Sequence, residues 1–518
     1  MSMTKDQSSR AAAILTARET VANVTGAAEA IAHETPAVTP VAVRPQNAEE
    51  MLEQVRRQAI EVIDLRITDL FGRWHHLSIP ADQLDKETFT DGIPFDSSSI
   101  PGFRQIQESD MIMVPDPTTA FRDPFTEAGT MSVACDVYEP SFRRYERDPR
   151  AIAQRAEEYL RQTGIATASH WGPELEFFIF DDVNFYEGMN RAGYELFSSE
   201  ADWNDTAGGT APGYRVRPKH GYFPVAPTDQ LQDVRTAMVR LLRTCGISVE
   251  RHHHEVATAG QAEINFRFDT LTRTADNVQI YKYIVKNTAR MYGKTATFMP
   301  KPLYGDNGSG MHTHQSLSFE ENPIFYDVEG YAGLSSLAQS YVAGLLLHAS
   351  AILGLSNAST NSYKRLVPGY EAPVNLVYAE GNRSAAVRVP IGSAAPKAKR
   401  IEFRPPDATG NAYLDFAAML MAGLDGIMRR LDPVELSMGP VEENVYALSP
   451  EKQAEIAHVP GSLEEALDAL ERDHEFLLRG GVFSEDLIQT WITTKRREEV
   501  DAVRTRPHPH EFYLYFDI

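Results

Sequence analysis

Alternating apolar and polar residues predict a buried strand over residues 171–180. Residues two apart on a strand share a face, so Glu174 and Glu176 point to the same side. Leu175 and Phe177 lie on the opposite side. Two carboxylates on one buried face are unfavourable unless a positive charge lies between them. A bound metal cation is the expected counter-charge.

The same kind of pattern predicts a mixture of helices and strands along the rest of the chain. Helical patterns cover residues 47–60, 149–163, 230–245, 275–292, an apolar run ending at 355, 412–430, a segment after 462, and 485–503. Strand patterns cover residues 62–70, 76–79, 132–138 and 249–268, with a short aromatic strand at the end of the chain. Turn-forming residues indicate loops around short strands at 90–123 and a surface loop at 198–219.

Capping residues mark the expected start of four helices. Asn47 precedes the first of them, and Asp148 stands before a proline at the first helical position of the second. Asp229 is the expected cap of a third helix. Ser462 and Glu465 have the spacing of a capping box.

Three further carboxylates have the spacing of strand residues. Glu255 and Glu263 are eight residues apart, which places them on one face if the strand is continuous, whereas a turn near Gly260 would interrupt it. Glu402 lies in residues 400–404, where charged and apolar side chains alternate. Together with the first strand, these segments predict an acidic site.

Histidines accompany the carboxylates. His312 and His314 share a strand face behind a glycine-rich turn, and the run His252–His254 precedes Glu255. A His-x-His pair is compatible with zinc. Because most of the accompanying groups are carboxylates, the set favours Mg²⁺ or Mn²⁺, and Mn²⁺ tolerates a histidine ligand. One such residue alone is more often a surface charge or a core histidine, but several acidic strands in one chain favour a metal site.

Basic residues cluster in the second half of the chain. Guanidinium groups bind phosphate and carboxylate oxygens in a bidentate manner. The cluster consists of Arg365, Arg383, Arg388, Lys397, Lys399, Arg400 and Arg404. A solvated basic face is the better interpretation of residues 397–399 taken alone. Arginines beside metal-binding carboxylates predict phosphoryl transfer to an anionic substrate, although neither a Walker A loop nor a GxGxxG motif occurs.

Composition narrows the classes of function. The chain has 518 residues, 42% hydrophobic residues and a net charge of −22, which predicts more than one domain and excludes general binding to nucleic acid or anionic membranes. Cys135 and Cys245 give no disulfide framework, which fits a reducing compartment. The apolar run 342–355 is too short to span a bilayer. Residues 1–45 have no core pattern, and a disordered extension is expected.

Seven segments resemble bacterial class I glutamine synthetases, and the resemblance runs from about residue 48 to the C-terminus. The matching segments are Phe95-Asp96-x-Ser98-Ser99-Ile100, WGPELEFF at 171–178, HHHEVATAGQ at 252–261, KTATFMPKP at 294–302, NGSGMHTH at 307–314, NSYKRLVPGYEAP at 361–373 and NRS at 382–384. Each motif is weak by itself, but their combination and order are specific.

The resemblance implies an α+β fold with a small β-grasp domain over 46–145 and a catalytic domain over 146–518. The catalytic domain is expected to have a curved antiparallel sheet, a half-barrel, flanked by helices. The expected assembly is a cytoplasmic homo-dodecamer of two stacked hexameric rings, in which the β-grasp domain completes the neighbouring subunit's site. The implied reaction joins ammonium to L-glutamate through a γ-glutamyl phosphate, using ATP and two or three Mg²⁺ or Mn²⁺ ions.

The resemblance also implies roles for individual residues. One metal is expected on Glu176, Glu255 and Glu263, and the other on Glu174, His312 and Glu402. Glutamate-site positions are Asn307, Gly308, Arg365 and Arg404. The phosphates and the transferred phosphoryl group match Arg383 and Arg388, and the nucleotide matches Phe268, His314, Ser316, Lys397 and Arg400. The ammonium site matches Asp96, Ser99, Tyr222 and Glu255, and the closing lid matches Glu371.

Some positions depart from the usual family pattern. Ser97 stands where glycine is common, and Phe103 stands where tryptophan is frequent. These departures leave two alternatives open, a γ-glutamylamide synthetase that uses an organic amine and a non-catalytic regulatory relative. Tyr446 lies where many class I enzymes are modified by an adenylyltransferase, but its flanking residues differ, and an ordinary loop tyrosine is the alternative.

Overall fold

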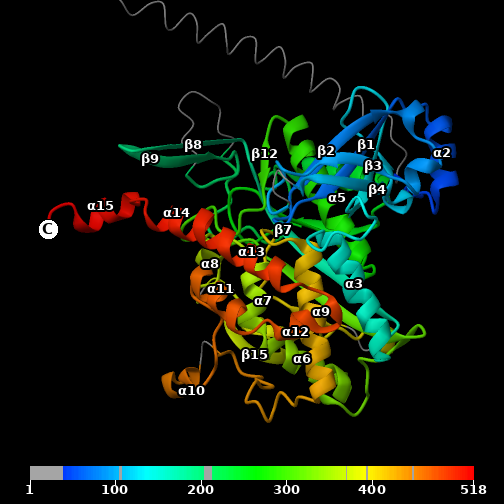
Figure 1. The fold of residues 1–518 in the computed structure, drawn as a ribbon. Helices are drawn as coiled ribbons and strands as arrows, with labels where there is room; N and C mark the ends of the chain where they lie inside the picture. The colour runs from blue at the N-terminus through cyan, green and yellow to red at the C-terminus, as the bar shows by residue number, and fades with distance from the viewer. Residues whose placement is uncertain are drawn as a thin grey trace, which may run out of the picture.

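The computed structural model describes residues 39–103, 108–203, 213–368, 370, 372–392, 395–445 and 448–518. Two sheets organise this part of the chain, a six-stranded sheet near the N-terminus and a nine-stranded sheet formed by later strands (Figure 1). A two-stranded hairpin of β8 (Asp182–Gly188) and β9 (Arg191–Phe197) projects away from both sheets. Most of the extension expected at 1–45 lies outside the described residues. Its last residues are placed on the protein by Arg44, whose side chain donates to the Cys245 carbonyl.

The six-stranded sheet has the order β2-β1-β6-β4-β3, with β5 paired to β6. β1 and β6 run parallel, and the other pairs are antiparallel. Its core is formed by alternate residues such as Ile63, Leu65 and Val133, all fully buried beneath the helix α2. The bounds are α2 (Ala48–Arg57), β1 (Val62–Thr68), β2 (Trp74–Pro80), β3 (Ile93–Asp96), β4 (Asp110–Pro115), β5 (Phe121–Arg122) and β6 (Thr130–Tyr138).

The nine-stranded sheet has the order β10-β11-β7-β13-β17-β16-β15, with β12 on β7 and β14 on β13. Its pairs are antiparallel except for β15 and β16, which run parallel. The expected curled sheet flanked by helices is confirmed, with this one parallel pair as a correction. The bounds are β7 (Ala168–Phe180), β10 (Val249–His254), β11 (Gln261–Phe266), β12 (Thr295–Thr297), β13 (Met311–Phe319), β14 (Asn322–Pro323), β15 (Asn375–Glu380), β16 (Ala385–Val389) and β17 (Ile401–Phe403).

Helices cover the face of the large sheet that carries the apolar residues of β7. Trp171 stacks on Phe416 of α9, and Phe177 meets Tyr281 of α5 edge to face. Close approach of α6 and α9 requires glycine, because a Cβ on Gly344 would lie 2.1 Å from a backbone oxygen of α9. The bounds are α3 (Pro149–Thr163), α4 (Gln232–Thr244), α5 (Leu271–Met291), α6 (Ser336–Leu347), α7 (Ala349–Ser356), α8 (Ser362–Arg365), α9 (Ala412–Arg429), α10 (Pro450–Ala454), α11 (Leu463–Arg472), α12 (Glu475–Leu478), α13 (Glu485–Lys495), α14 (Asp501–Arg504) and α15 (Pro509–Tyr515).

Two cap predictions hold and two need correction. Asn47 and Asp148 accept hydrogen bonds from the first turns of α2 and α3. Asp229 does not cap α4, which begins after Leu231, and its carboxylate instead accepts from the Leu231 NH. Ser462 caps α11, but the Glu465 carboxylate reaches the NH of the preceding glycine rather than that of Ser462.

Three predicted elements differ from the structure. The strand expected over 249–268 is a hairpin, because β10 ends before the turn that contains Gly260. The apolar helix ending at 355 is a pair, α6 and α7, bent by 68°. The aromatic end of the chain is the helix α15, not a strand, and Pro509 occupies its first turn. Among the described residues no single helix is long and apolar enough to cross a membrane, whereas the bent pair passes that test by length and composition alone.

A buried arginine ties the two sheets together. Arg150 of α3 pairs with Asp116 just after β4 (2.6 Å), with Asp136 of β6 (2.5 Å) and with Asp276 of α5 (2.9 Å). Tyr413 of α9 also donates to Asp276, at 2.7 Å. One guanidinium therefore neutralises carboxylates from both halves of the molecule.

We expect Arg150→Ala to destabilise the protein by about 3–5 kcal/mol, because it leaves buried carboxylates without a counter-charge. The measurement is the urea midpoint for loss of tryptophan fluorescence. Arg161→Ala on the exposed face of the same helix is the matched control, since its ion pair with Glu158 is solvated. Equal midpoints for the two variants would show that the Arg150 network does not hold the junction.

Candidate active site

The acidic residues meet on one face of β7 and its neighbours. Glu174 lies opposite His312 of β13, and Glu176 lies opposite Glu263 of β11. On the other side of β13, His314 lies opposite Glu402 of β17. Leu175 and Phe177 point to the helical side and are fully buried. Strand register alone thus brings together residues that are more than two hundred positions apart.

The first of two potential metal-binding groups consists of Glu174, His312 and Glu402, whose ligand atoms all lie within 4.8 Å of one another. His312 Nδ1 is 3.8 Å from Glu174 Oε2 and 3.7 Å from Glu402 Oε1. Burial opposes ionisation of Glu174, but hydrogen bonds from His312 and His314 hold the pKa of Glu174 well below its usual value. The group is therefore anionic at neutral pH.

The second group consists of His253, Glu255 and Glu263, again within 4.8 Å. His253 Nδ1 is 3.4 Å from Glu255 Oε1, and its Nε2 is 3.6 Å from Glu263 Oε1. Sequence reasoning missed His253 as a member. The sequence contains a run of three histidines, but their spacing does not determine which ring turns toward Glu263. The register of the β10–β11 hairpin selects His253, because His253 pairs with Glu263.

The other two histidines of that run point elsewhere. His252 accepts from the buried guanidinium of Arg235 at 3.4 Å. His254 lies 3.1 Å from the buried carboxylate of Glu200, which raises the pKa of His254 despite the opposing effect of burial. Both rings are therefore engaged away from the carboxylate pair.

Glu176 lies between the two groups. Its Oε2 accepts from the Gly310 NH at 3.0 Å and from Gln261 Nε2 at 3.3 Å. Burial, together with repulsion from Glu263, raises the pKa of Glu176. A cation close to Glu176 and Glu263 would relieve this repulsion. Gln261 was not expected in the site, and only its place in β11 opposite Phe178 reveals it.

Both groups fit a divalent cation by the chemistry of their donors. Each offers two carboxylates and one imidazole, and no cysteine lies among them. Such a set suits Mg²⁺ or Mn²⁺ better than a structural zinc. Glu402 belongs to the set although it is buried, because His314, Arg404 and His312 outweigh burial and lower the pKa of Glu402.

Arginines border the first group. Arg388 Nη1 donates to Glu402 at 2.6 Å, and Arg404 Nε donates to the same carboxylate at 3.1 Å. Arg365 is buried, donates to the Pro405 carbonyl at 2.7 Å and reaches His312 Nε2 at 3.3 Å. Arg383 is exposed, and its carbonyl accepts from Arg404. Positive charge therefore surrounds the end of the acidic face, where anionic substrates would need it.

Residues expected around a nucleotide lie along β13 and nearby. Arg400 Nε donates to His314 Nδ1 at 3.3 Å, and Ser316 follows on the same face of β13. Phe268 is half-exposed and meets the ring of His170 edge to face. Lys397 is exposed in a short 3₁₀ turn (Pro396–Ala398).

The solvated-face interpretation of residues 397–399 needs correction at Lys399. Its side chain is buried, and its Nζ donates to the Ala332 carbonyl at 2.6 Å. Lys399 therefore fixes the loop before β17 to the segment that precedes α6.

The remaining expected residues divide into those near the acidic face and those away from it. Asn307 and Gly308 lie in the loop before β13, where the Gly308 carbonyl accepts from Gln261. A Cβ on Gly308 would lie 2.4 Å from a backbone oxygen, so the loop requires glycine there. Tyr222 is half-exposed and meets His253 edge to face.

Asp96 and Ser99 belong to the other sheet. Asp96 ends β3, is exposed, and accepts from the Ser98 NH at 2.8 Å, and this hydrogen bond lowers the pKa of Asp96. Ser99 is exposed in the turn that follows. Glu371 and Tyr446 lie outside the described residues.

Comparison with known proteins places these features in one family. The family model of the glutamine synthetase β-grasp domain matches residues 59–140, and that of the glutamine synthetase catalytic domain matches residues 146–515. The chain is 53% identical over 475 residues to the glutamine synthetase of Nostoc sp., covering 91% of this chain and 99% of the relative. It is 51% identical over 479 residues to that of Mycolicibacterium smegmatis, with the same coverage. The solved structure of Plasmodium falciparum glutamine synthetase superposes with a TM-score of 0.84 at 31% identity, covering 92% of this chain and 100% of that one.

The two groups predict two binding sites for Mn²⁺ with separate ligands. We expect Glu174→Gln and Glu263→Gln each to weaken one of them about tenfold or more, because a neutral amide replaces an anionic ligand. Electron paramagnetic resonance of free Mn²⁺ measures the occupancy. Glu250→Gln is the matched control, since Glu250 is exposed on β10 outside both groups. If either test variant still bound Mn²⁺ at both sites with wild-type affinity, the ligand assignment would be contradicted.

Proposed function

The chain belongs to the glutamine synthetase family, and from that premise we propose how its site joins ammonia to L-glutamate at the expense of ATP, giving L-glutamine, ADP and phosphate. The observation that carries the proposal is the acidic face of β7, β11, β13 and β17, which is bordered by Arg365, Arg388 and Arg404. Carboxylates that can hold cations, next to guanidinium groups, are what phosphoryl transfer between anions requires.

The reaction needs activation because a carboxylate is a poor electrophile. An oxygen of the glutamate γ-carboxylate attacks the γ-phosphorus of ATP, the bond to the bridging oxygen breaks, and ADP leaves. The amine nitrogen then attacks the acyl carbon of the γ-glutamyl phosphate. Phosphate leaves with the original carboxylate oxygen, and the nitrogen gives up a proton.

Arginines would hold the two anionic substrates in line. We assign Arg365 and Arg404, with Asn307 and Gly308, to glutamate, and Arg383 and Arg388 to the phosphates. The contacts of Arg388 and Arg404 with Glu402 support this, because they fix both side chains at the edge of the acidic face. Charged groups that are already fixed in place stabilise a transition state most effectively, because they need no rearrangement during the reaction.

Divalent cations held by the acidic face would supply positive charge that offsets the negative charge of the phosphates. The family uses ATP and divalent metal. We propose two ions for each site, one held by Glu174, His312 and Glu402 and the other by Glu176, Glu255 and Glu263. His253 lies against the second set and would help to hold its carboxylates or join them.

Nucleotide binding is assigned to Phe268, His314, Ser316, Lys397 and Arg400. Phe268 offers an exposed ring beside β7, on which a base could stack. Arg400 and His314 contact each other at the opposite end of the acidic face from Glu176. If the base of ATP stacks on Phe268 and its phosphates extend past Arg400 and His314, the terminal phosphate would lie near the metal-binding groups.

Ammonium must lose a proton before it can attack, and Asp96 is the proposed base. Ser99, Tyr222 and Glu255 would complete the ammonium site. Asp96 and Ser99 lie on the small sheet, whereas the acidic face lies on the large sheet. We propose that the small sheet of a neighbouring subunit supplies these two residues to each site, within a cytoplasmic dodecamer of two hexameric rings. Residues 46–145 would then form the β-grasp domain that closes the next subunit's site.

A lid at Glu371 would exclude water from the acyl phosphate. Tyr446 would be the residue that an adenylyltransferase modifies.

Subunit mixing tests the shared site directly. We expect Asp96→Ala and Glu263→Ala each to lower glutamine formation from ammonium by about a hundredfold or more. Dissociating and reassembling the two variants together should restore about a quarter of the activity, because a ring with a heterologous interface then contains sites with both intact halves.

Two controls sharpen the mixing test. A mixture of Glu174→Ala with Glu263→Ala should stay inactive, since both changes fall on the same half of the site. The wild-type enzyme is assayed with ammonium, methylamine and ethanolamine, and ammonium should be the best substrate. Failure of the first mixture to recover activity would contradict the shared site, and a strong preference for an organic amine would contradict glutamine formation.

A further inference from the structure

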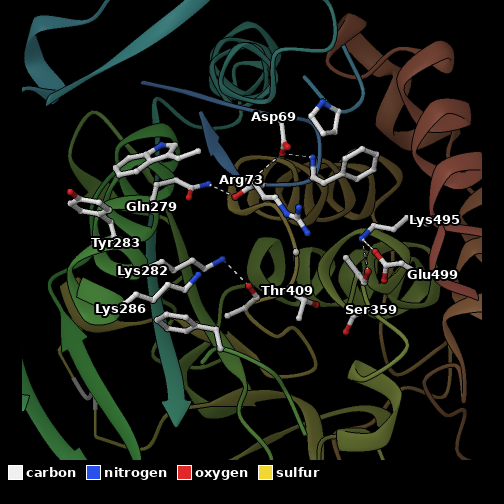
Figure 2. A pocket seen from close by; sticks show the side chains of 18 of the residues that line it. Asp69, Arg73, Gln279, Lys282, Tyr283, Lys286, Ser359, Thr409, Lys495 and Glu499 are labelled. Carbon is white, nitrogen blue, oxygen red and sulfur yellow. Dashed lines mark hydrogen bonds and ion pairs between the residues drawn. The ribbon is translucent and has the colours of Figure 1, made fainter. Parts of the chain in front are cut away.

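A second cavity lies between the two sheets, apart from the acidic face. Its volume is about 610 Å³. The turn between β1 and β2, the helix α5, residues 408–410 and the helix α13 form its walls. Figure 2 shows that side chains from these four segments point into a common space. Neither of the two metal-binding groups lines it.

Three cations face this cavity. Arg73 projects from the β1–β2 turn, and Lys282 and Lys286 project from one side of α5 (Figure 2). Within the described part of the chain, no carboxylate forms an ion pair with any of the three. Lys282 Nζ donates to the Ala408 carbonyl at 2.7 Å, and Lys286 lies 5.8 Å from the centre of the Phe298 ring.

The acids that line the cavity are engaged by other groups. Asp69 accepts from the backbone NH groups of Phe71 and Arg73 and contacts His75. Glu499 pairs with Lys495 at 2.5 Å. Glu498 pairs with Arg497, which does not line the cavity. With Lys495 included, the lining holds four cations and three carboxylates, so it is net positive in a chain whose net charge is −22.

Lys286 is repelled by each of the other two cations. Burial lowers the pKa of Lys286, and the charge of Arg73 adds to this effect. Burial and the charge of Lys286 lower the pKa of Lys282 to about 8. The charges of Asp415 and Asp407 oppose this decrease. Both of these acids are completely buried, and burial raises the pKa of each. An anion in the cavity would remove this repulsion.

Aromatic side chains form part of the wall and indicate the kind of ligand. Phe71, Trp74, Tyr283 and Phe298 line the cavity. We propose that the cavity binds a small organic dianion, a dicarboxylate or a phosphate monoester. Its charged groups would contact Arg73, Lys282 and Lys286, and its carbon skeleton would lie against the rings.

The position of the cavity suggests an effect on the catalytic site, and this part rests on the proposed function. Lys282 holds the Ala408 carbonyl, and Asp407 accepts from the Thr409 NH at 2.9 Å. The same segment begins at Pro405 and Pro406, whose carbonyls accept from Arg365 at 2.7 and 3.3 Å. A ligand that competes for Lys282 would therefore alter the segment that positions Arg365.

Calorimetric titration of the full-length protein with succinate and with glycerol 3-phosphate tests the binding. We expect one of the two to bind with one site per chain, and which one binds identifies the charged group. Arg73→Gln and Lys286→Gln should each weaken that binding about tenfold. Arg290→Gln is the control, because Arg290 is exposed on α5 and does not line the cavity. Arg73 and Lys286 line the cavity but each keeps part of its side chain exposed, so both variants are expected to fold.

Two outcomes would overturn the proposal. One is the absence of heat with both compounds, and the other is binding that Arg73→Gln and Lys286→Gln leave unchanged, which would place the ligand in the catalytic site. Glutamine formation is measured on the same samples. Loss of calorimetric binding in variants that keep full glutamine formation supports the cavity and leaves the catalytic proposal intact, whereas an inactive wild-type sample that still binds would contradict only the catalytic proposal.

Discussion

Like charge on one face of β7 is the constraint on which the catalytic half of the molecule depends. Glu174 and Glu176 share that face because of the strand period, and their neighbours on β11 and β17 add Glu263 and Glu402. Such carboxylates would not stay ionised in a protein interior by themselves. Histidine and arginine side chains surround them, and cations would complete the neutralisation. The apolar face of the same strand supplies the core packing that fixes the spacing.

The second organising feature is the junction between the sheets. Arg150 connects acids from both halves at its centre, and the cation-lined cavity lies along the same boundary. One arginine there pairs with three carboxylates, whereas Arg73, Lys282 and Lys286 form no ion pair with any residue that the structure describes. The same boundary therefore combines a rigid connection with a place where a small anion could act on the segment that holds Arg365.

Much of this arrangement could be predicted from the sequence where local physics decides it. The period of two in β7 predicted the shared carboxylate face, and Asn47 and Asp148 predicted helix starts. The predictions that failed concern features set by contacts between residues that are far apart in the sequence. The choice of His253 over its neighbours follows from its pairing with Glu263. Arg73 and Lys286 are more than two hundred positions apart, so no local pattern could place them in one cavity.

The central claim is that glutamate is activated by transfer of a phosphoryl group at the acidic face of β7. Glutamate labelled with ¹⁸O in its γ-carboxylate tests it most directly. If a γ-glutamyl phosphate forms, one carboxylate oxygen leaves with phosphorus, and mass spectrometry of the released phosphate must show one ¹⁸O atom for each glutamine made. Released phosphate without label would contradict the account, because ATP would then have been hydrolysed by water rather than by attack of the glutamate carboxylate.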